Sequence, residues 1–201
     1  MQKTKIALVG EDWDVIDLIE NLPHLELVGL FAPTVIHGTE LRHLGSDADW
    51  KADNATKIVI AVDLPKVRQK LFDHYCDILT LVSPNCYVSL RAHIGEGCII
   101  QRGVTLMAHA KLGRGCKINL NATIHHDVSI GDFCTIAPGA IILGHVTIEQ
   151  GAYIGAGAII KQRCRIGSHA IVGAGAVVVR DVPDHTTVVG VPAQPKSVHN
   201  V

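Results

Sequence analysis

The sequence lacks the features that mark several common classes of protein. No run approaches the roughly 18 to 20 apolar residues of a membrane-spanning helix. The N-terminal MQKTKIALVG has neither the long apolar stretch nor the small-residue cleavage site of a secretory signal. The 18 basic and 19 acidic residues leave a formal net charge of -1, which gives no general attraction for nucleic acid or anionic membrane. We therefore expect a cytoplasmic protein without nucleic-acid or membrane partners.

Paired cysteines and aromatic residues are also scarce. The six cysteines include no CxxC pair, so a zinc ribbon or a dithiol redox motif is not expected. Aromatic residues make up 4% of the chain, although 48% of it is hydrophobic. The core must therefore be built from small and aliphatic side chains.

The chain does contain a strict six-residue repeat. Every sixth residue from Val82 to Val178 is Val, Ile or Leu, and the fourth residue after each is Ala, Val or Cys. Helices have a period near 3.6 residues and strands a period of 2, so neither explains two apolar columns with a period of six. The pattern predicts a hexapeptide-repeat parallel β-helix over residues 81–180, with three repeats in each triangular coil.

The repeat also gives a reason for most cysteines and several glycines. Five of the six cysteines fall in the small column: Cys86, Cys98, Cys116, Cys134 and Cys164. Glycine directly follows the aliphatic position in several repeats: Gly95, Gly113, Gly131, Gly155 and Gly173. We interpret the cysteines as buried small hydrophobes and the glycines as corners that need a permissive backbone.

Residues 1–80 have a different hydrophobic pattern and are predicted to form a small α/β domain. Three apolar runs predict buried parallel strands: 5–10, 25–32 and 57–63. Two segments between and after them predict helices: 15–22 and 64–79. The polar stretch 43–56 is expected to be a loop.

The six-residue repeat ends after Val178. Prolines follow at Pro183, Pro192 and Pro195, and we expect them to end the ladder and leave a C-terminal tail over 181–201.

Two segments carry a resemblance to a known family: INLNATIHHDVSIGDFCTIAPGA (118–140) and RDVPDHTTVVGVPA (180–193). The chain resembles hexapeptide acyltransferases of the branch of sialic acid O-acetyltransferases and UDP-4-amino-sugar N-acetyltransferases. The resemblance covers nearly the whole chain. It implies a Rossmann-like domain that binds a sugar nucleotide, a left-handed β-helix, a homotrimer and acetyl-CoA as cosubstrate, with no metal.

Within the first segment, His126 matches the family's catalytic histidine and Asp127 its acidic neighbour, whereas His125 falls where members vary. An imidazole can take the proton that an amine or hydroxyl loses as it attacks the thioester. A carboxylate on the other ring nitrogen fixes the tautomer. The family's mechanism is direct attack in a ternary complex.

Residues 18 apart should stack on neighbouring coils, about 4.8 Å apart. This places His109, Asp127 and His145 in one column. We expect Asp127 to be flanked by the two imidazoles, whose roles the sequence leaves open.

The resemblance also implies further site residues, at the positions that match those of the family. Thr135, Ala156 and Ala174 match acetyl-CoA contacts, and Gly144 leaves space near the thioester. A zinc site like that of hexapeptide carbonic anhydrases is not expected, because position 131, five residues after His126, is glycine.

The acceptor site is expected at the turns after the first and last strands of the N-terminal domain, at Gly10, Glu11, Asp12 and Asp63. Family members usually carry a glycine-rich turn with a histidine at the first place, but this chain has GEDWD (10–14). These carboxylates would repel a diphosphate, so the nucleotide pocket is either rebuilt or lost.

Three functions remain open from the sequence. The first is acetyl transfer to an amino sugar, nucleotide-linked, with His126 as base. The second is O-acetylation of a sialic acid or another small hydroxyl acceptor. The third is a trimeric scaffold without activity, against which the intact His126-Asp127 pair argues.

Overall fold

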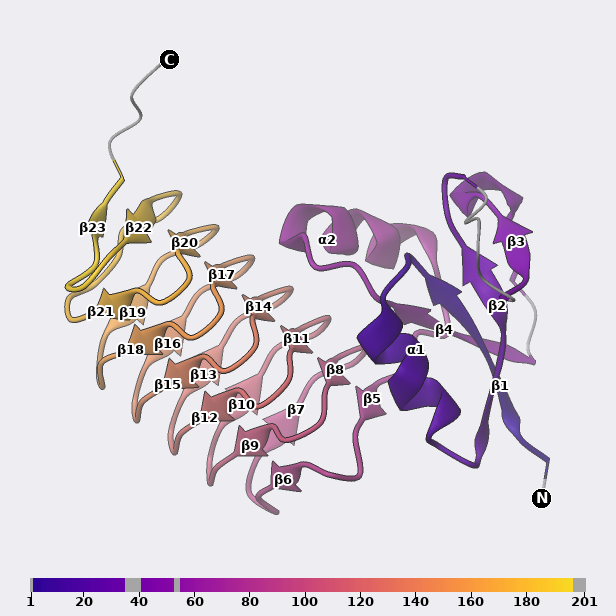
Figure 1. The fold of residues 1–201 in the computed structure, drawn as a ribbon, viewed down its shortest axis with the longest axis horizontal. Coiled ribbons are helices and arrows are strands. Elements are labelled where there is room, and N and C mark those ends of the chain that lie inside the picture. The colour runs from indigo at the N-terminus through magenta and orange to yellow at the C-terminus, as the bar shows by residue number, and fades with distance from the viewer. Residues whose placement is uncertain (1, 35–40, 53–54, 197–201) are drawn as a thin grey trace.

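The computed structural model describes residues 2–34, 41–52 and 55–196. A small α/β domain packs against the first coils of a long stack, and the later coils extend away from it (Figure 1). Neither α-helix in the described part of the chain has the length and apolar character needed to cross a membrane.

The N-terminal domain is a parallel sheet with strand order β3-β2-β1-β4. The strands are β1 Thr4–Val9, β2 Leu25–Phe31, β3 His43–Gly45 and β4 Thr56–Ile60. The helices are α1 Trp13–Glu20 and α2 Pro65–His74. The three predicted strands and two predicted helices are confirmed, but the second helix ends at His74, after which Ile78 bridges to Ile58 of β4.

The expected loop over 43–56 is wrong in part. It contains β3 and the 3₁₀ turn η1 Asp47–Asp49, while residues 53 and 54 lie outside the described residues. A three-residue edge strand is too short to show an alternating pattern, which is why the sequence did not reveal it.

The predicted parallel β-helix is confirmed, with three sheets of stacked two-residue strands. Sheet one contains β5 Leu81–Val82, β8 Ile99–Ile100, β11 Lys117–Ile118, β14 Thr135–Ile136, β17 Tyr153–Ile154 and β20 Ile171–Val172. Sheet two contains β6 Tyr87–Val88, β9 Thr105–Leu106, β12 Thr123–Ile124, β15 Ile141–Ile142, β18 Ile159–Ile160 and β21 Val177–Val178. Sheet three contains β7 His93–Ile94, β10 Lys111–Leu112, β13 Ser129–Ile130, β16 Thr147–Ile148 and β19 Arg165–Ile166.

The chain visits the sheets in the order one, two, three, and each strand pairs with the residues 18 positions further on, as in Thr123↔Ile141. The aliphatic and small columns form one continuous buried core. The three sheets form the sides of a triangular prism. We name its three edges 1–2, 2–3 and 3–1 after the sheets that the corners at each edge join.

The ladder continues beyond Val178, contrary to the expectation. Strand β22 Thr187–Val189 pairs in parallel with β20, and β23 Gln194–Pro195 pairs antiparallel with β22. Pro183 and Pro192 flank β22 and leave its backbone N–H groups free to pair, so they do not prevent the extra strand.

The glycines that follow the aliphatic positions are needed for space, not for backbone freedom. A β-carbon on Gly95 or Gly155 would lie 2.5 Å from backbone atoms of the next coil, and neither residue has a positive φ. The positive φ values fall two residues later, at every sixth residue from Gly97 to Gly175. His109, Asp127 and His145 all occupy this left-handed position, with φ values of 57° to 62°.

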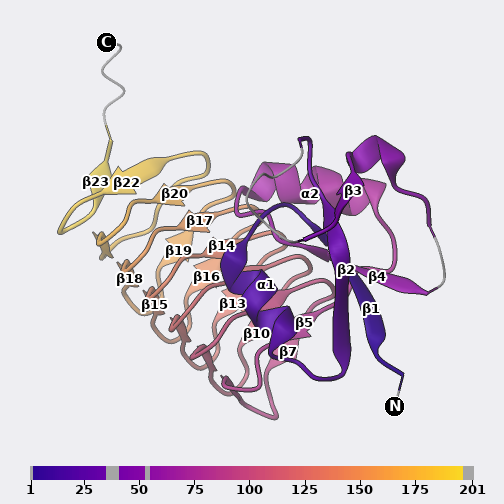
Figure 2. The same cartoon turned by 45° about the vertical axis from the view of Figure 1, so that its right-hand side comes forward.

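The N-terminal domain covers sheet one near the start of the helix. Apolar residues of α1 form one cluster with β1, β2 and Leu81 and Ile99 of sheet one. Phe72 of α2 packs edge-on against Phe133 at edge 3–1, with ring centroids 5.1 Å apart. Figure 2 shows α1 lying across the first coils.

Candidate active site

His126 and Asp127 form a hydrogen-bonded pair at a corner of edge 2–3, between β12 and β13. His126 Nδ1 donates to Asp127 Oδ2 over 2.8 Å. A carboxylate can only accept, so Nδ1 carries a proton, and in the neutral imidazole Nε2 presents its lone pair. The αL conformation of Asp127, with φ of 57°, is one that short polar side chains tolerate, and here it occurs at the corner that carries the pair.

The neighbouring coils bring the other two histidines of the column toward Asp127. His145 Nε2 lies 3.9 Å from Asp127 Oδ2, and its ring is nearly perpendicular to that of His126, with centroids 5.2 Å apart. His109 lines the same hollow as Asp127. The hydrogen bond from His126 is the main cause that lowers the pKa of Asp127, and His145 and His109 act in the same direction. The carboxylate therefore stays ionised beside the imidazole.

A cavity of about 240 Å³ opens beside His126. It is lined by His125, His126, Leu143, Gly144, His145, Gln162 and Arg163. A β-carbon on Gly144 would come within 3.0 Å of His126 Nε2, so glycine keeps the space next to this nitrogen open. Within the described part of the chain, His125 Nδ1 is buried there without a hydrogen-bond partner. Nε2 of His126 thus faces a space that a small molecule can enter.

The same residues are arranged in a way that a metal ion could use. Within the described residues, ligand atoms of His126, Asp127 and His145 lie within 4.8 Å of one another. The hydrogen bond between His126 and Asp127 already accounts for the close approach of two of these groups without an ion. The absence of a metal requirement stays a prediction.

Two of the predicted acetyl-CoA contacts lie on a different edge from the base. Ala156 and Ala174 are exposed at corners of edge 1–2, between β17 and β18 and between β20 and β21. Each precedes a glycine, Gly157 or Gly175, at which an added β-carbon would meet no atom within 4 Å. This part of edge 1–2 is therefore open, and in one chain it does not join His126.

Thr135, the third predicted contact, is fully buried under the N-terminal domain. Its Oγ1 donates to the backbone oxygen of Asp63 over 2.7 Å and accepts from Arg68 over 2.9 Å. The repeat places position 135 outward from sheet one, but the domain covers sheet one there. This burial argues against a contact with acetyl-CoA, and we assign Thr135 to the contact between the domains.

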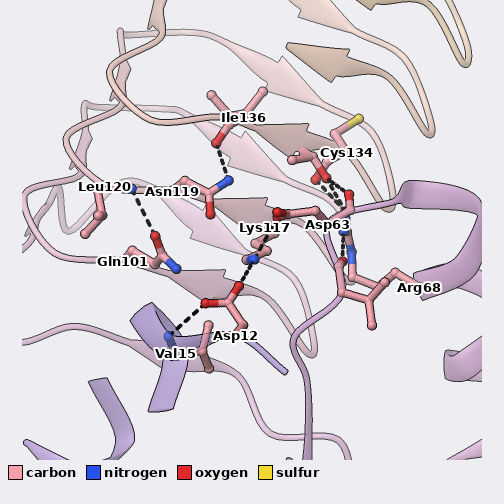
Figure 3. A network of polar contacts seen from close by, with 12 residues as sticks. Asp12, Val15, Asp63, Arg68, Gln101, Lys117, Asn119, Leu120, Cys134 and Ile136 are labelled. Carbon is pink, nitrogen blue, oxygen red and sulfur yellow. Dashed lines mark hydrogen bonds and ion pairs between the residues drawn. The ribbon is translucent and has the colours of Figure 1, made fainter. Parts of the chain in front are cut away.

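The acidic residues of the predicted acceptor site are joined through Lys117 of β11. The Lys117 side chain is 1% exposed, and its Nζ contacts the carboxylates of both Asp12 and Asp63, the latter at 2.7 Å (Figure 3). Asp12 also caps α1, since its Oδ1 accepts from the backbone N–H of Val15. The single positive charge of Lys117 therefore offsets one of the two negative charges of Asp12 and Asp63, and Asp12 is one of the carboxylates expected to repel a diphosphate.

The other two residues of that predicted site have local roles. Glu11 accepts a hydrogen bond from Trp13 Nε1 over 3.0 Å at the surface. Gly10 has a φ of 89°, and a β-carbon there would lie 2.9 Å from the side chain of Val62. These contacts shape the turn after β1.

Arg68 of α2 is a residue that the sequence reasoning missed. It is 1% exposed and donates to backbone oxygens of both domains, including Val62, Gly115 and Phe133. Burial lowers the pKa of its guanidinium. The spacing of Pro65, Arg68 and Leu71, which are the buried residues of α2, was a signal that Arg68 faces inward.

Comparisons with known proteins agree with the fold. Residues 104–192 match the family described as the GMPPB C-terminal domain. A comparison with curated proteins finds no significant match. Among solved structures, the acetyltransferase domain of PglB from Neisseria gonorrhoeae aligns with a TM-score of 0.90 and 28% identity over 96% of this chain and 100% of that one.

Two further structures are similar over the same extent. PerB from Caulobacter crescentus has a TM-score of 0.85 and 28% identity, over 96% of this chain and 97% of that one. WeeI from Acinetobacter baumannii has a TM-score of 0.84 and 31% identity, over 96% of this chain and 100% of that one. The resemblance inferred from the sequence is thereby confirmed, and the chain belongs to the hexapeptide-repeat sugar acetyltransferases.

Proposed function

We propose that the protein transfers an acetyl group from acetyl-CoA to the amino group of a nucleotide-linked amino sugar. The observation that carries this proposal is the His126–Asp127 pair, whose free Nε2 faces an open cavity in a chain of this family. Relatives support both substrates. The PglB domain was solved with acetyl coenzyme A, and PerB with CoA and GDP-perosamine.

In the proposed reaction, the acceptor amine attacks the thioester carbonyl while His126 Nε2 takes one of its protons. A carbon–nitrogen bond forms, the carbon–sulfur bond breaks, and the proton on Nε2 then passes to the departing CoA sulfur. Asp127 holds the imidazole in the required tautomer and balances the charge of the transient imidazolium. No covalent intermediate with the enzyme is needed.

The positions of the site residues support an assembly of several copies, and we propose the homotrimer that the resemblance implies. His126 lies on edge 2–3, whereas Ala156 and Ala174 lie on edge 1–2. A single straight prism cannot bring two of its edges together. A cyclic assembly can, because edge 2–3 of one copy then faces edge 1–2 of the next.

The domain limits follow the same proposal. Residues 1–80 form a Rossmann-like domain that binds the sugar nucleotide, supported by the parallel order β3-β2-β1-β4. Residues 81–180 form the acetyltransferase domain, with the left-handed winding of the family, and 181–201 follow it. A cytoplasmic location is part of the proposal.

The direct test is an assay of CoA release over a panel of UDP-, dTDP- and GDP-linked amino sugars and free sialic acids. We expect activity on an amino sugar and a loss of about 100-fold or more in kcat for His126→Ala, the usual size of a general-base contribution. His24→Ala, an exposed histidine of the N-terminal domain, is the matched control. Full activity of His126→Ala would refute the mechanism, and activity only on hydroxyl acceptors would refute the amine.

Binding of the cosubstrate is tested separately by thermal unfolding. Acetyl-CoA at 100 times its dissociation constant should stabilise the fold by about 2.7 kcal/mol. If acetyl-CoA left the melting temperature unchanged, the scaffold hypothesis would replace the enzyme.

A further inference from the structure

A cavity of about 230 Å³ lies between α1 and edge 1–2 of the β-helix. The helix contributes Asp14, Asp17 and Leu18, and three successive corners contribute Pro84, Gln101 and Leu120, among other residues. It is smaller than the roughly 300 Å³ at which pockets for drug-sized ligands begin. Its size suits a single ring and not a whole nucleotide sugar.

Each of the two walls carries both charged and apolar groups. Asp14 and Asp17 are three residues apart and therefore share one face of α1, and both line the cavity. Arg102 of the β-helix also lines it, and it supplies donors for an anionic group such as a phosphate. Leu18, Pro84 and Leu120 give apolar surface. Carboxylates for hydroxyl groups and an apolar patch for C–H groups together suit a sugar ring.

Gln101 gives independent support for a ligand. Its side chain is 1% exposed and lines the cavity, and its Oε1 accepts from the backbone N–H of Leu120 over 3.1 Å. A backbone N–H can only donate, so this bond fixes the orientation of the amide. Among the residues that the structure describes, Nε2 is then left buried without a partner. Buried donors are rarely left unpaired, and an unpaired one calls for a missing acceptor.

We propose that this cavity binds the hydroxylated ring of the acceptor sugar, with a ring or hydroxyl oxygen accepting from Gln101 Nε2. The proposal rests on the proposed function and moves the acceptor away from Asp12 and Asp63, which Lys117 already occupies. The cavity lies on edge 1–2, as do Ala156 and Ala174. The ring pocket and the acetyl-CoA contacts of one copy would then both face His126 of its neighbour.

Calorimetric titration of the full-length protein with GDP-perosamine, in the presence of CoA, tests this assignment, with GDP alone as the second probe. The double variant Asp14→Asn/Asp17→Asn removes both charges from exposed positions and should leave folding intact. We expect its Kd for GDP-perosamine to rise at least tenfold while its Kd for GDP stays within twofold of wild type. Gln101→Leu should weaken GDP-perosamine in the same selective way. Asp73→Asn on the exposed face of α2 is the matched control and should change neither Kd.

Three outcomes would overturn the assignment: unchanged binding of GDP-perosamine by the double variant, equal weakening of both probes, or no binding of GDP-perosamine by wild type. The CoA-release assay decides the proposed function on its own. Acetyl transfer by wild type together with any of these three outcomes would remove the ring pocket and leave the acetyltransferase.

Discussion

Gly144 lies against the imidazole of His126, so that a β-carbon at position 144 would come within 2.9 Å of Cε1 and 3.0 Å of Nε2. Gly144 has no positive φ, so the backbone itself would accept another residue. The glycine is therefore needed for the space in front of the His126 ring.

Gly144→Ala should lower kcat while leaving the fold intact. The added methyl group must push the ring aside or fill the place of the reacting groups, and a misplacement of about 1 Å can cost about 100-fold. We expect a loss of at least about tenfold in kcat for CoA release, with a melting temperature close to that of wild type. A variant with wild-type kcat would show that Nε2 does not act on this side of the ring.

The pKa of Asp127 should report the hydrogen bond to His126. That bond is the largest cause of the lowered pKa, so we expect the Asp127 carboxyl to titrate below the ordinary value of 3.8 in wild type and closer to it in His126→Asn. Because the folded pKa is lowered, the stabilising contribution of Asp127 is present above the ordinary pKa and is lost as the pH falls through the folded value. Titration followed by ¹³C NMR of the carboxyl carbon measures both values. Identical titration in the two proteins would contradict the pairing.

Lys117→Met should weaken the contact between the two domains and lower the free energy of unfolding. The substitution keeps the length of the buried stem but leaves Asp12, whose side chain is 15% exposed, without its cation. Removing one partner of a fully buried pair costs about 3–5 kcal/mol, and because Asp63 is half exposed we expect about 2–3 kcal/mol in urea unfolding.

Lys57→Met provides the comparison for that measurement. Lys57 pairs with Asp77 over 2.8 Å, but both side chains are about 40% exposed, so its loss should cost less than about 1 kcal/mol. Equal losses for the two variants would show that the Lys117 pairs do not hold the domains together.

The contrast between the β-helix and the domain contact shows which features the sequence could predict. The six-residue repeat predicts that Ile124 lies in the core. It also predicts that Asp127 lies above His109, because each residue stacks on the residue 18 positions away in the next coil. The partners of Lys117 and Arg68 do not follow from any period. Lys117 meets Asp12 across 105 residues, and only the docking of the two domains decides that contact.

The same reason explains why the sequence did not reveal the burial of Thr135. The repeat shows that Thr135 points outward from sheet one, as Tyr153 does one coil later, but only the fold shows that the N-terminal domain covers Thr135. The two positions look alike in sequence and differ in their surroundings.

The buried cysteines of the small column should not react with thiol reagents in the folded protein. Cys98, Cys116 and Cys134 are buried and donate to backbone oxygens of the next coil, as in Cys98 Sγ to Gly113 at 3.1 Å. The neighbouring thiol of the next coil and burial raise the pKa of Cys98 and of Cys116. We expect a thiol reagent at pH 8 to modify Cys76, which is exposed, and to reach the buried cysteines only after unfolding. Rapid modification of Cys116 in the folded protein would contradict the packing of the column.

Subunit complementation tests whether the site is shared between copies. His126→Asn removes the base from edge 2–3, and Ala156→Trp fills the open corner on edge 1–2, so each variant alone should be inactive. In assemblies formed by unfolding and refolding an equal mixture, a site with an intact base and an intact neighbouring edge arises in about one case in four for random cyclic assembly. We therefore expect roughly a quarter of wild-type activity to return. Two copies of one variant cannot supply both edges, so refolding each variant separately is the control. If the mixture stays as inactive as its components, His126 and Ala156 do not meet across a subunit boundary, and the open edge 1–2 must serve some purpose other than binding acetyl-CoA.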